Sequence, residues 1–302
     1  MDGFGAWRRA RRADEAAIRA FIREREAYAA GLAGRIRAPD GRLRLPGRPG
    51  GLYLSAGDGG SPRGLCFFGA GRSVLPLFSA PSAAEAAGLG ELAAALRFRP
   101  AACVGAADAV DALEAECAWE PPIRQRYRAM SLDADDYRPA DGPDGPDGPD
   151  GPDGPDGPGG LALRRATLAD LDGLFPLACA YEREEVLSSL HRFDPAAAKA
   201  TQLRALREQR VYLAEERGRI VGRAQTNARG WARDQIGGVY VLPELRGRGI
   251  GRAVVQALLS EILAAGRGAA LFVKDGNRAA RGLYGTLGFK DRGAFRVDYF
   301  AS

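Results

Sequence analysis

Histidine and lysine are scarce in this sequence of 302 residues. His191 is the single histidine, and lysine occurs only at positions 199, 274 and 290. A histidine-based metal site or a Ser-His-Asp triad therefore has little to build from, and we expect no metal centre. The net charge of +5 comes almost entirely from arginine. We interpret it as compositional bias rather than a nucleic-acid footprint, although it suits a polyanionic ligand.

Cysteines are also few, and long apolar runs are absent. The four cysteines at positions 66, 103, 117 and 179 form no Cys-x-x-Cys pair, so we expect free thiols in a reducing cytoplasm. No apolar run reaches the roughly 18 residues of a membrane-spanning helix. The polar, arginine-rich start has no apolar core of a signal peptide. These absences predict a cytoplasmic protein without a membrane partner.

The composition changes abruptly at residues 141–158, where Asp-Gly-Pro is repeated six times. The repeat has the Gly-X-Y period of collagen, but it is too short and too acidic for a triple helix. We predict a semi-extended spacer. It divides the chain into a domain at residues 1–138, a linker at 139–160 and a second domain at 161–302, which fits the length of the chain.

A strand, a glycine-rich turn and a helix follow one another late in the chain. Residues 236–242 are β-branched and aromatic, Pro243 ends the strand, and apolar residues from Ile250 onward have helical spacing. Gly247, Gly249 and Gly251 lie between them. A turn without Cβ atoms lets backbone N–H groups converge at a helix N-terminus, which suits a pyrophosphate. The turn has no Gly-Lys-Ser/Thr sequence and no G-x-G-x-x-G spacing, which excludes the P-loop and the dinucleotide fingerprint.

Two motifs give this half of the chain its resemblance to a known family. Residues 246–251 read Arg-Gly-Arg-Gly-Ile-Gly, and residues 277–289 read Asn-Arg-Ala-Ala-Arg-Gly-Leu-Tyr-Gly-Thr-Leu-Gly-Phe. The first resembles motif A of the GCN5-related N-acetyltransferases (GNAT), Q/R-x-x-G-x-G/A. The second resembles their motif B. Both motifs match at every specified position, in the family's order. The resemblance covers residues 161–302.

The resemblance implies a GNAT acyl-CoA N-acyltransferase fold, an α/β architecture with a mixed sheet, and acetyl-CoA bound where two strands separate. The pantetheine arm would pair with the backbone of Val239, Tyr240 and Val241 like an added strand. The pyrophosphate would be held at Arg246, Gly247, Arg248, Gly249, Ile250, Gly251 and Arg252. Asn277 would bind pantetheine, or serve as a plain helix N-cap. Arg281 would reach a phosphate, or be a solvated helix residue.

The resemblance also assigns chemical roles. Tyr284 occupies the family's position for the acid that protonates the departing thiolate; the alternative is an amphipathic core tyrosine. The general base is less defined, because residues 235–240 carry no carboxylate and Asp234 precedes them. Glu184 and Glu185 are candidate bases, unless they belong to a solvated helix face. Thr226 and Asn227 are candidates to position a water or the substrate.

The N-terminal half has the same predicted order of elements as the C-terminal half. A helix from Asp14 to Tyr28, a loop over 31–50, strands at 52–54, 65–68 and 73–78, a helix over 82–96, a strand at 103–104, a helix over 108–117 and a strand at 126–132 are expected. Neither motif occurs there. We interpret this half as a degenerate GNAT-like domain without a coenzyme A site. In the C-terminal half we expect a final pair of strands around Phe289 and residues 296–300.

Taken together, these observations predict transfer of an acetyl group from acetyl-CoA to a small-molecule or peptide amine by direct attack in a ternary complex. The competing interpretation is a non-catalytic acyl-CoA sensor of the same fold. The arginine-rich N-terminus raises nucleic-acid binding as a third class, but no base-reading motif supports it. The sequence leaves monomer and homodimer both open, and it does not identify the acceptor.

Overall fold

The computed structural model describes residues 7–47, 50–57, 60–80, 82–139, 160–187, 189–190 and 192–301. We refer to residues 7–139 as the N-terminal half and to residues 160–301 as the C-terminal half. His191 and the whole Asp-Gly-Pro repeat lie outside the described residues, so the predicted spacer and the division into two domains stay predictions.

Each half contains the same succession of helices and strands. The N-terminal half has β1 (Trp7–Arg9), α1 (Glu15–Glu24), α2 (Glu26–Ile36), β2 (Gly51–Ala56), β3 (Pro62–Phe68), β4 (Ser73–Phe78), α3 (Ala83–Ala95), β5 (Ala102–Ala106), α4 (Ala107–Cys117) and β6 (Ile123–Leu132). The C-terminal half has β7 (Leu161–Arg165), α5 (Leu171–Tyr181), a π-helical turn (Glu182–Val186), α6 (Pro195–Glu208), β8 (Val211–Glu216), β9 (Arg219–Arg229), β10 (Arg233–Val241), α7 (Ile250–Ala264), β11 (Gly268–Lys274), α8 (Arg278–Thr286) and β12 (Lys290–Tyr299).

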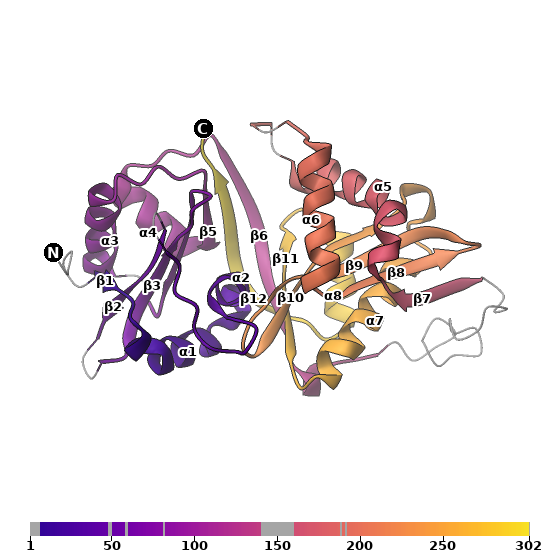
Figure 1. Cartoon of the computed structure of the whole chain (residues 1–302), viewed down its shortest axis with the longest axis horizontal. Helices are drawn as coiled ribbons and strands as arrows, with labels where there is room; N and C mark the ends of the chain where they lie inside the picture. Colours follow the sequence, from indigo (N-terminus) through magenta and orange to yellow (C-terminus); the bar gives the residue numbers. More distant parts are fainter. Residues whose placement is uncertain are drawn as a thin grey trace.

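All of these strands belong to one twelve-stranded sheet, in the order β1-β2-β3-β4-β5-β12-β6-β11-β10-β9-β8-β7. The order is symmetric, because each strand of one half has its counterpart at the same distance from the opposite edge. The last strand of each half lies in the sheet of the other half: β12 pairs with β5, and β6 pairs with β11. The two exchanged strands run side by side through the centre of the molecule (Figure 1).

The exchange corrects the prediction for the end of the chain. Instead of a pair of strands around Phe289 and residues 296–300, the structure has one continuous strand, β12. Its neighbours on both sides, β5 and β6, come from the N-terminal half. Alternating apolar residues predicted a strand but not its partners, which lie far away in sequence.

A second correction concerns residues 31–36, which were expected in a loop and form the last two turns of α2. Gly31 and Gly34 lie in this helix where it crosses β10 and β9. A Cβ atom at Gly34 would come within 3.3 Å of the Ala228 Cα, and one at Gly31 within 3.0 Å of the Gln235 Oε1. The glycines therefore let α2 pack closely on the sheet, and this packing outweighs the low helix propensity of glycine.

Helices cover both faces of the sheet. On one face α1 and α2 pack in an apolar cluster with Leu52, Leu65 and Leu77, and α5 and α6 cover the strands of the other half. On the opposite face α3 and α4 pack around Phe68 and Leu89. There α7 and α8 form the largest cluster, which includes Leu258. This mixed α/β sheet with helices on both faces confirms the predicted fold class.

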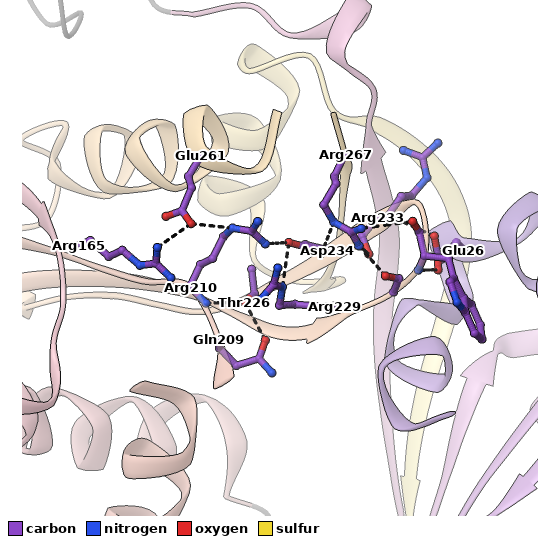
Figure 2. A network of polar contacts seen from close by, with 12 residues as sticks. Glu26, Arg165, Gln209, Arg210, Thr226, Arg229, Arg233, Asp234, Glu261 and Arg267 are labelled. Carbon is purple, nitrogen blue, oxygen red and sulfur yellow. Dashed lines mark hydrogen bonds and ion pairs between the residues drawn. The ribbon is translucent and has the colours of Figure 1, made fainter. Parts of the chain in front are cut away.

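The two halves are also joined by a buried carboxylate. Glu26, in α2 of the N-terminal half, is fully buried and accepts hydrogen bonds from the backbone N–H groups of Trp231, Ala232 and Arg233. Figure 2 shows this contact at one end of a chain of polar side chains that continues through Arg267 to Asp234. Because α2 packs on β9 and β10, the N-terminal half covers part of the sheet of the C-terminal half.

Within the described residues the four cysteines carry free thiols, three of them buried, as predicted. None of the described helices has the length and apolar character needed to span a bilayer.

Candidate functional site

The site forms where β10 and β11 separate. These parallel strands pair only from Arg233 to Ile236 on β10. Beyond this point the register between β9 and β10 shifts between Gly237 and Tyr240, and Gly238 has a φ of +59°. Strand β10 therefore has a bulge at Gly237 and Gly238. The bulge turns β10 away from β11, and no strand of the described residues pairs with Val239 or Val241 on that side.

A cavity of about 200 Å³ fills the opening between the separated strands. Four residues predicted for the site line it together: Glu185, Val239, Asn277 and Tyr284. Its other walls come from four elements and include Tyr127 of β6, Tyr181 of α5, Phe272 and Lys274 of β11, and Tyr299 of β12. Strand β6 belongs to the N-terminal half, so both halves contribute to the cavity.

The glycine-rich turn between β10 and α7 is open to an incoming ligand. Gly247 and Gly249 have φ values of +80° and +77°, and no atom lies within 4 Å of the place where a Cβ would stand at either residue. Gly249 is the N-cap of α7 and provides no side chain to cap the helix. The first N–H groups of α7 therefore face the space above the turn, which fits a pyrophosphate.

The arginines of this region differ in their partners. Arg246 forms an ion pair of 2.9 Å with Glu184, Arg248 one of 2.8 Å with Glu216, and Arg281 one of 3.7 Å with Asp275. Arg252 shows no carboxylate partner within the part of the chain that the structure describes, and its Nε is buried without a hydrogen bond. Of these four arginines, Arg252 is therefore the one with hydrogen-bond donors left for a phosphate.

Tyr284 lies at the inner end of the cavity. Its side chain is only 7% exposed, and its ring lies 5.6 Å from that of Phe289. Burial raises the pKa of its hydroxyl well above the usual range. The hydroxyl therefore remains a hydrogen-bond donor at physiological pH, while the ring belongs to the α7–α8 core. The core and acid interpretations are compatible.

The two candidate bases of the π-helical turn have different surroundings. Glu184 binds Arg246 and accepts a hydrogen bond of 3.0 Å from the Tyr240 hydroxyl, outside the lining of the cavity. The hydrogen bond from Arg246 lowers the pKa of Glu184. Glu185 lines the cavity and forms an ion pair of 2.9 Å with Lys274. Of the two carboxylates, only Glu185 shares a cavity with Tyr284.

The remaining polar candidates lie away from the centre of the cavity. Thr226 is fully buried, donates to the Gln209 Oε1 (2.8 Å) and accepts from the Arg210 N–H (3.0 Å). With its hydroxyl so engaged it is unavailable to a substrate in this structure. Asn227 is exposed and packs beside Gly237 at the rim. Asn277 caps α8 by accepting from the Ala280 N–H (3.0 Å), and it also lines the cavity.

Asp234 is buried in an ion-pair network below the bulge. It contacts Arg210, Arg267 and, at 3.9 Å, Arg229. Figure 2 shows this network extending through Arg210 to Glu261. Because its oxygens contact these arginines and it does not line the cavity, Asp234 is not placed to act as the base.

Arg223 on β9 was missed by sequence reasoning. Its guanidinium is buried, donates from Nε to the Gly238 carbonyl oxygen (3.1 Å) and lies 5.5 Å from the ring centre of Tyr181. Burial lowers its pKa to about 10. By binding the carbonyl of the bulge, Arg223 fixes the point where β10 turns away from β11. The signal in the sequence that could have identified Arg223 is an arginine within a hydrophobic strand.

Residues 177–289 match the family described as Acetyltransferase (GNAT) family. The C-terminal half carries a GNAT domain. No curated protein matches the chain. A solved GCN5-related N-acetyltransferase from Sphaerobacter thermophilus is 17% identical, with a TM-score of 0.56, over 96% of this chain and 93% of that one. One from Kribbella flavida is 15% identical, with a TM-score of 0.55, over 92% and 95%.

A tandem GNAT protein from the clavulanic acid biosynthesis pathway is also similar: it is 17% identical, with a TM-score of 0.53, over 85% of each chain. At these identities the likeness is one of fold. It extends over both halves, in agreement with the repeated order of elements. The N-terminal half thus has the same order of elements as the GNAT domain, without its two motifs.

Proposed function

We propose that the protein transfers an acetyl group from acetyl-CoA to a primary amine that enters the cavity beside Glu185. The observation that carries this proposal is a set of four features: the strand that turns away at Gly238, the uncapped start of α7 that follows this strand in the chain, and, in the cavity beside the bulge, the phenol of Tyr284 and the carboxylate of Glu185. The first two suit the binding of coenzyme A, and the last two suit acyl transfer.

The residues would divide the binding of acetyl-CoA as follows. The N–H groups of Gly249, Ile250 and Gly251 and the side chain of Arg252 would hold the pyrophosphate. The free backbone edge of Val239 and Val241 would pair with the pantetheine arm, which the bulge leaves room for. This arrangement directs the thioester toward Tyr284.

The chain then supplies the proton transfers that the reaction needs. Glu185 accepts the proton of the attacking amine, directly or through water, as the new N–C bond forms. A backbone N–H of β10 near Tyr240 stabilises the oxyanion. Tyr284 gives a hydrogen bond, and then its proton, to the sulfur as the C–S bond breaks. Because burial raises the pKa of the phenol, the hydroxyl is protonated when the sulfur begins to leave, and the phenolate that remains takes up the proton that Glu185 received from the amine.

The sensor interpretation remains the alternative, because Glu185 already pairs with Lys274. The test combines calorimetry of acetyl-CoA binding to the full chain with thiol release in the presence of a panel of amines. We expect binding, and release with some amines. Tyr284→Phe should lower turnover roughly 100-fold with little change in affinity.

Tyr53→Phe is the matched control, because this tyrosine packs on Phe68 in the N-terminal half. Its turnover should equal that of the unmodified protein. Binding without release for every amine would instead favour the sensor, and equal rates for Tyr284→Phe would limit Tyr284 to a role in the core.

A further inference from the structure

A second cavity lies in the N-terminal half, in the position that corresponds to the reaction cavity. It measures about 160 Å³ and opens where β4 and β5 separate. Their last paired residues are Val74 and Cys103, as Ile236 and Leu271 are in β10 and β11. Counting on from these pairs, residues 75–77 and 104–106 line the second cavity where residues 237–239 and 272–274 line the first.

The second cavity has lost the features that suit coenzyme A. Pro76 stands where Gly238 stands in the other half, and proline has no N–H to offer an added strand. At the start of α3, Ser82 caps the helix by accepting from the Glu85 N–H (3.2 Å). The buried side chain of Glu85 accepts from Ser82 in return, at 3.0 Å. A carboxylate at this helix start disfavours a pyrophosphate.

What remains is an apolar chamber. Leu32 of α2, Leu75 and Leu77 of β4, and Phe295 and Val297 of β12 form its walls. Phe295 stacks on Phe272 at 3.7 Å between ring centres, and Phe272 lines both cavities. An apolar cavity of about 150 Å³ is large enough to take up a benzene ring, so the second cavity has room for one ring or a short alkyl chain.

Three polar side chains lie around this chamber: Tyr28, Arg35 and Gln235. Arg35 donates from Nη1 to the Gly31 carbonyl oxygen (2.9 Å), and within the described ranges no carboxylate pairs with it. The Arg35 side chain is exposed to solvent. A guanidinium without a counter-ion beside an apolar chamber is complementary to an anion with an apolar body.

We propose that this cavity binds a small aryl or alkyl carboxylate, with the apolar body between α2 and β4 and the carboxylate on Arg35. Tyr28 and Gln235 provide further donors for the same carboxylate. Because Gln235 precedes the bulge on β10 and Phe272 is shared, the occupant contacts the walls of the reaction cavity without entering it. The proposal concerns binding alone and does not depend on acetyl transfer.

The test is calorimetric titration of the full chain with phenylacetate, beside phenylacetamide and phenethylamine, which keep the ring and change the charge. We expect phenylacetate to saturate a single site, and phenylacetamide and phenethylamine to bind at least tenfold more weakly, about 1.4 kcal/mol. Excess acetyl-CoA should leave phenylacetate binding unchanged. Displacement by acetyl-CoA, or equal affinity for the amide, would overturn the proposal.

Two variants locate the site. Arg35→Gln should weaken phenylacetate at least tenfold, whereas Arg23→Gln, an exposed arginine on neighbouring α1, should not. Leu77→Trp should fill the chamber and abolish binding. Because Leu77→Trp can disrupt folding, thermal melting of this variant is measured as well. Arg35→Gln changes an exposed residue, and its result alone decides whether the site is correctly assigned. Undiminished binding to Arg35→Gln, or no saturation with the unmodified protein, would contradict the assignment.

Discussion

Asp170 joins three groups at the start of the C-terminal half. It accepts from the Thr167 N–H (2.7 Å) and the Thr167 hydroxyl (3.0 Å), and it forms an ion pair of 2.6 Å with Arg164. The hydrogen bond from Arg164 lowers its pKa to about 2. The N-terminal half repeats the arrangement, since Asp14 pairs with Arg8 at the same 2.6 Å. This repeated residue pair fixes the first strand of each half to the helix that follows.

Asp170→Asn should therefore destabilise the protein in a pH-dependent way. A carboxylate with a lowered folded pKa contributes its full stability above the unfolded value of 3.8 and loses it as the pH falls toward 2. Denaturant unfolding should show a loss of about 1 kcal/mol at neutral pH, shrinking between these values. Asp172→Asn, an 86% exposed neighbour, should change little. A loss that is constant with pH would show that the charge of Asp170 is immaterial.

At the scale of residues, the sequence predicts those site residues that belong to one contiguous motif. Gly249, Asn277 and Tyr284 lie in two short motifs, and the structure brings Asn277 and Tyr284 into one cavity. Tyr127 and Arg223 belong to no motif. They reach the site by strand pairing, which depends on packing across the whole sheet.

At the scale of elements, the turn between β10 and α7 has one clearly defined proposed role, which is to bind the pyrophosphate of coenzyme A. Gly249→Glu should abolish acetyl-CoA binding, because it places a bulky negative side chain where the pyrophosphate would lie. Gly218→Glu is the control: Gly218 has a similar φ of +76°, and no atom lies within 4 Å of its Cβ position either. Calorimetry should show normal affinity for the control. Retained affinity in Gly249→Glu would remove the coenzyme A site from this turn.

Most elements were predictable because their local signals agree with the fold. In the structure, helical segments begin at two such local signals: the capping box of Thr167 with Asp170, and Asp194 followed by Pro195. The errors occurred where long-range packing decides. Gly31 and Gly34 read as loop residues locally, yet they let α2 approach β9 and β10 closely. The final strand was expected to pair within its own half, and it pairs across the molecule.

At the scale of the whole molecule, the exchange of β6 and β12 predicts that the halves stay together without a covalent link. A protease site placed within residues 145–154 should yield, after cleavage, two fragments that co-elute at the mass of the intact chain. Each fragment provides the strand that completes the sheet of the other. High salt should not separate them, because backbone hydrogen bonds and apolar packing hold the centre.

In denaturant the two fragments should separate, and this result is the control that cleavage was complete. Fragments that separate in native buffer would show that the exchange contributes little to association. Residues 161–302 expressed alone should fold poorly for the same reason, because β6 is missing between β11 and β12.

The exchanged strands also set the order of events during biosynthesis. Domains of a growing chain commonly fold one after the other, the N-terminal domain first. Here the N-terminal half emerges from the ribosome with β5 as an open edge, because its neighbour β12 ends only at Tyr299. Completion of the first half must wait until β12 has been synthesised, so the nascent chain carries an unpaired strand edge until then.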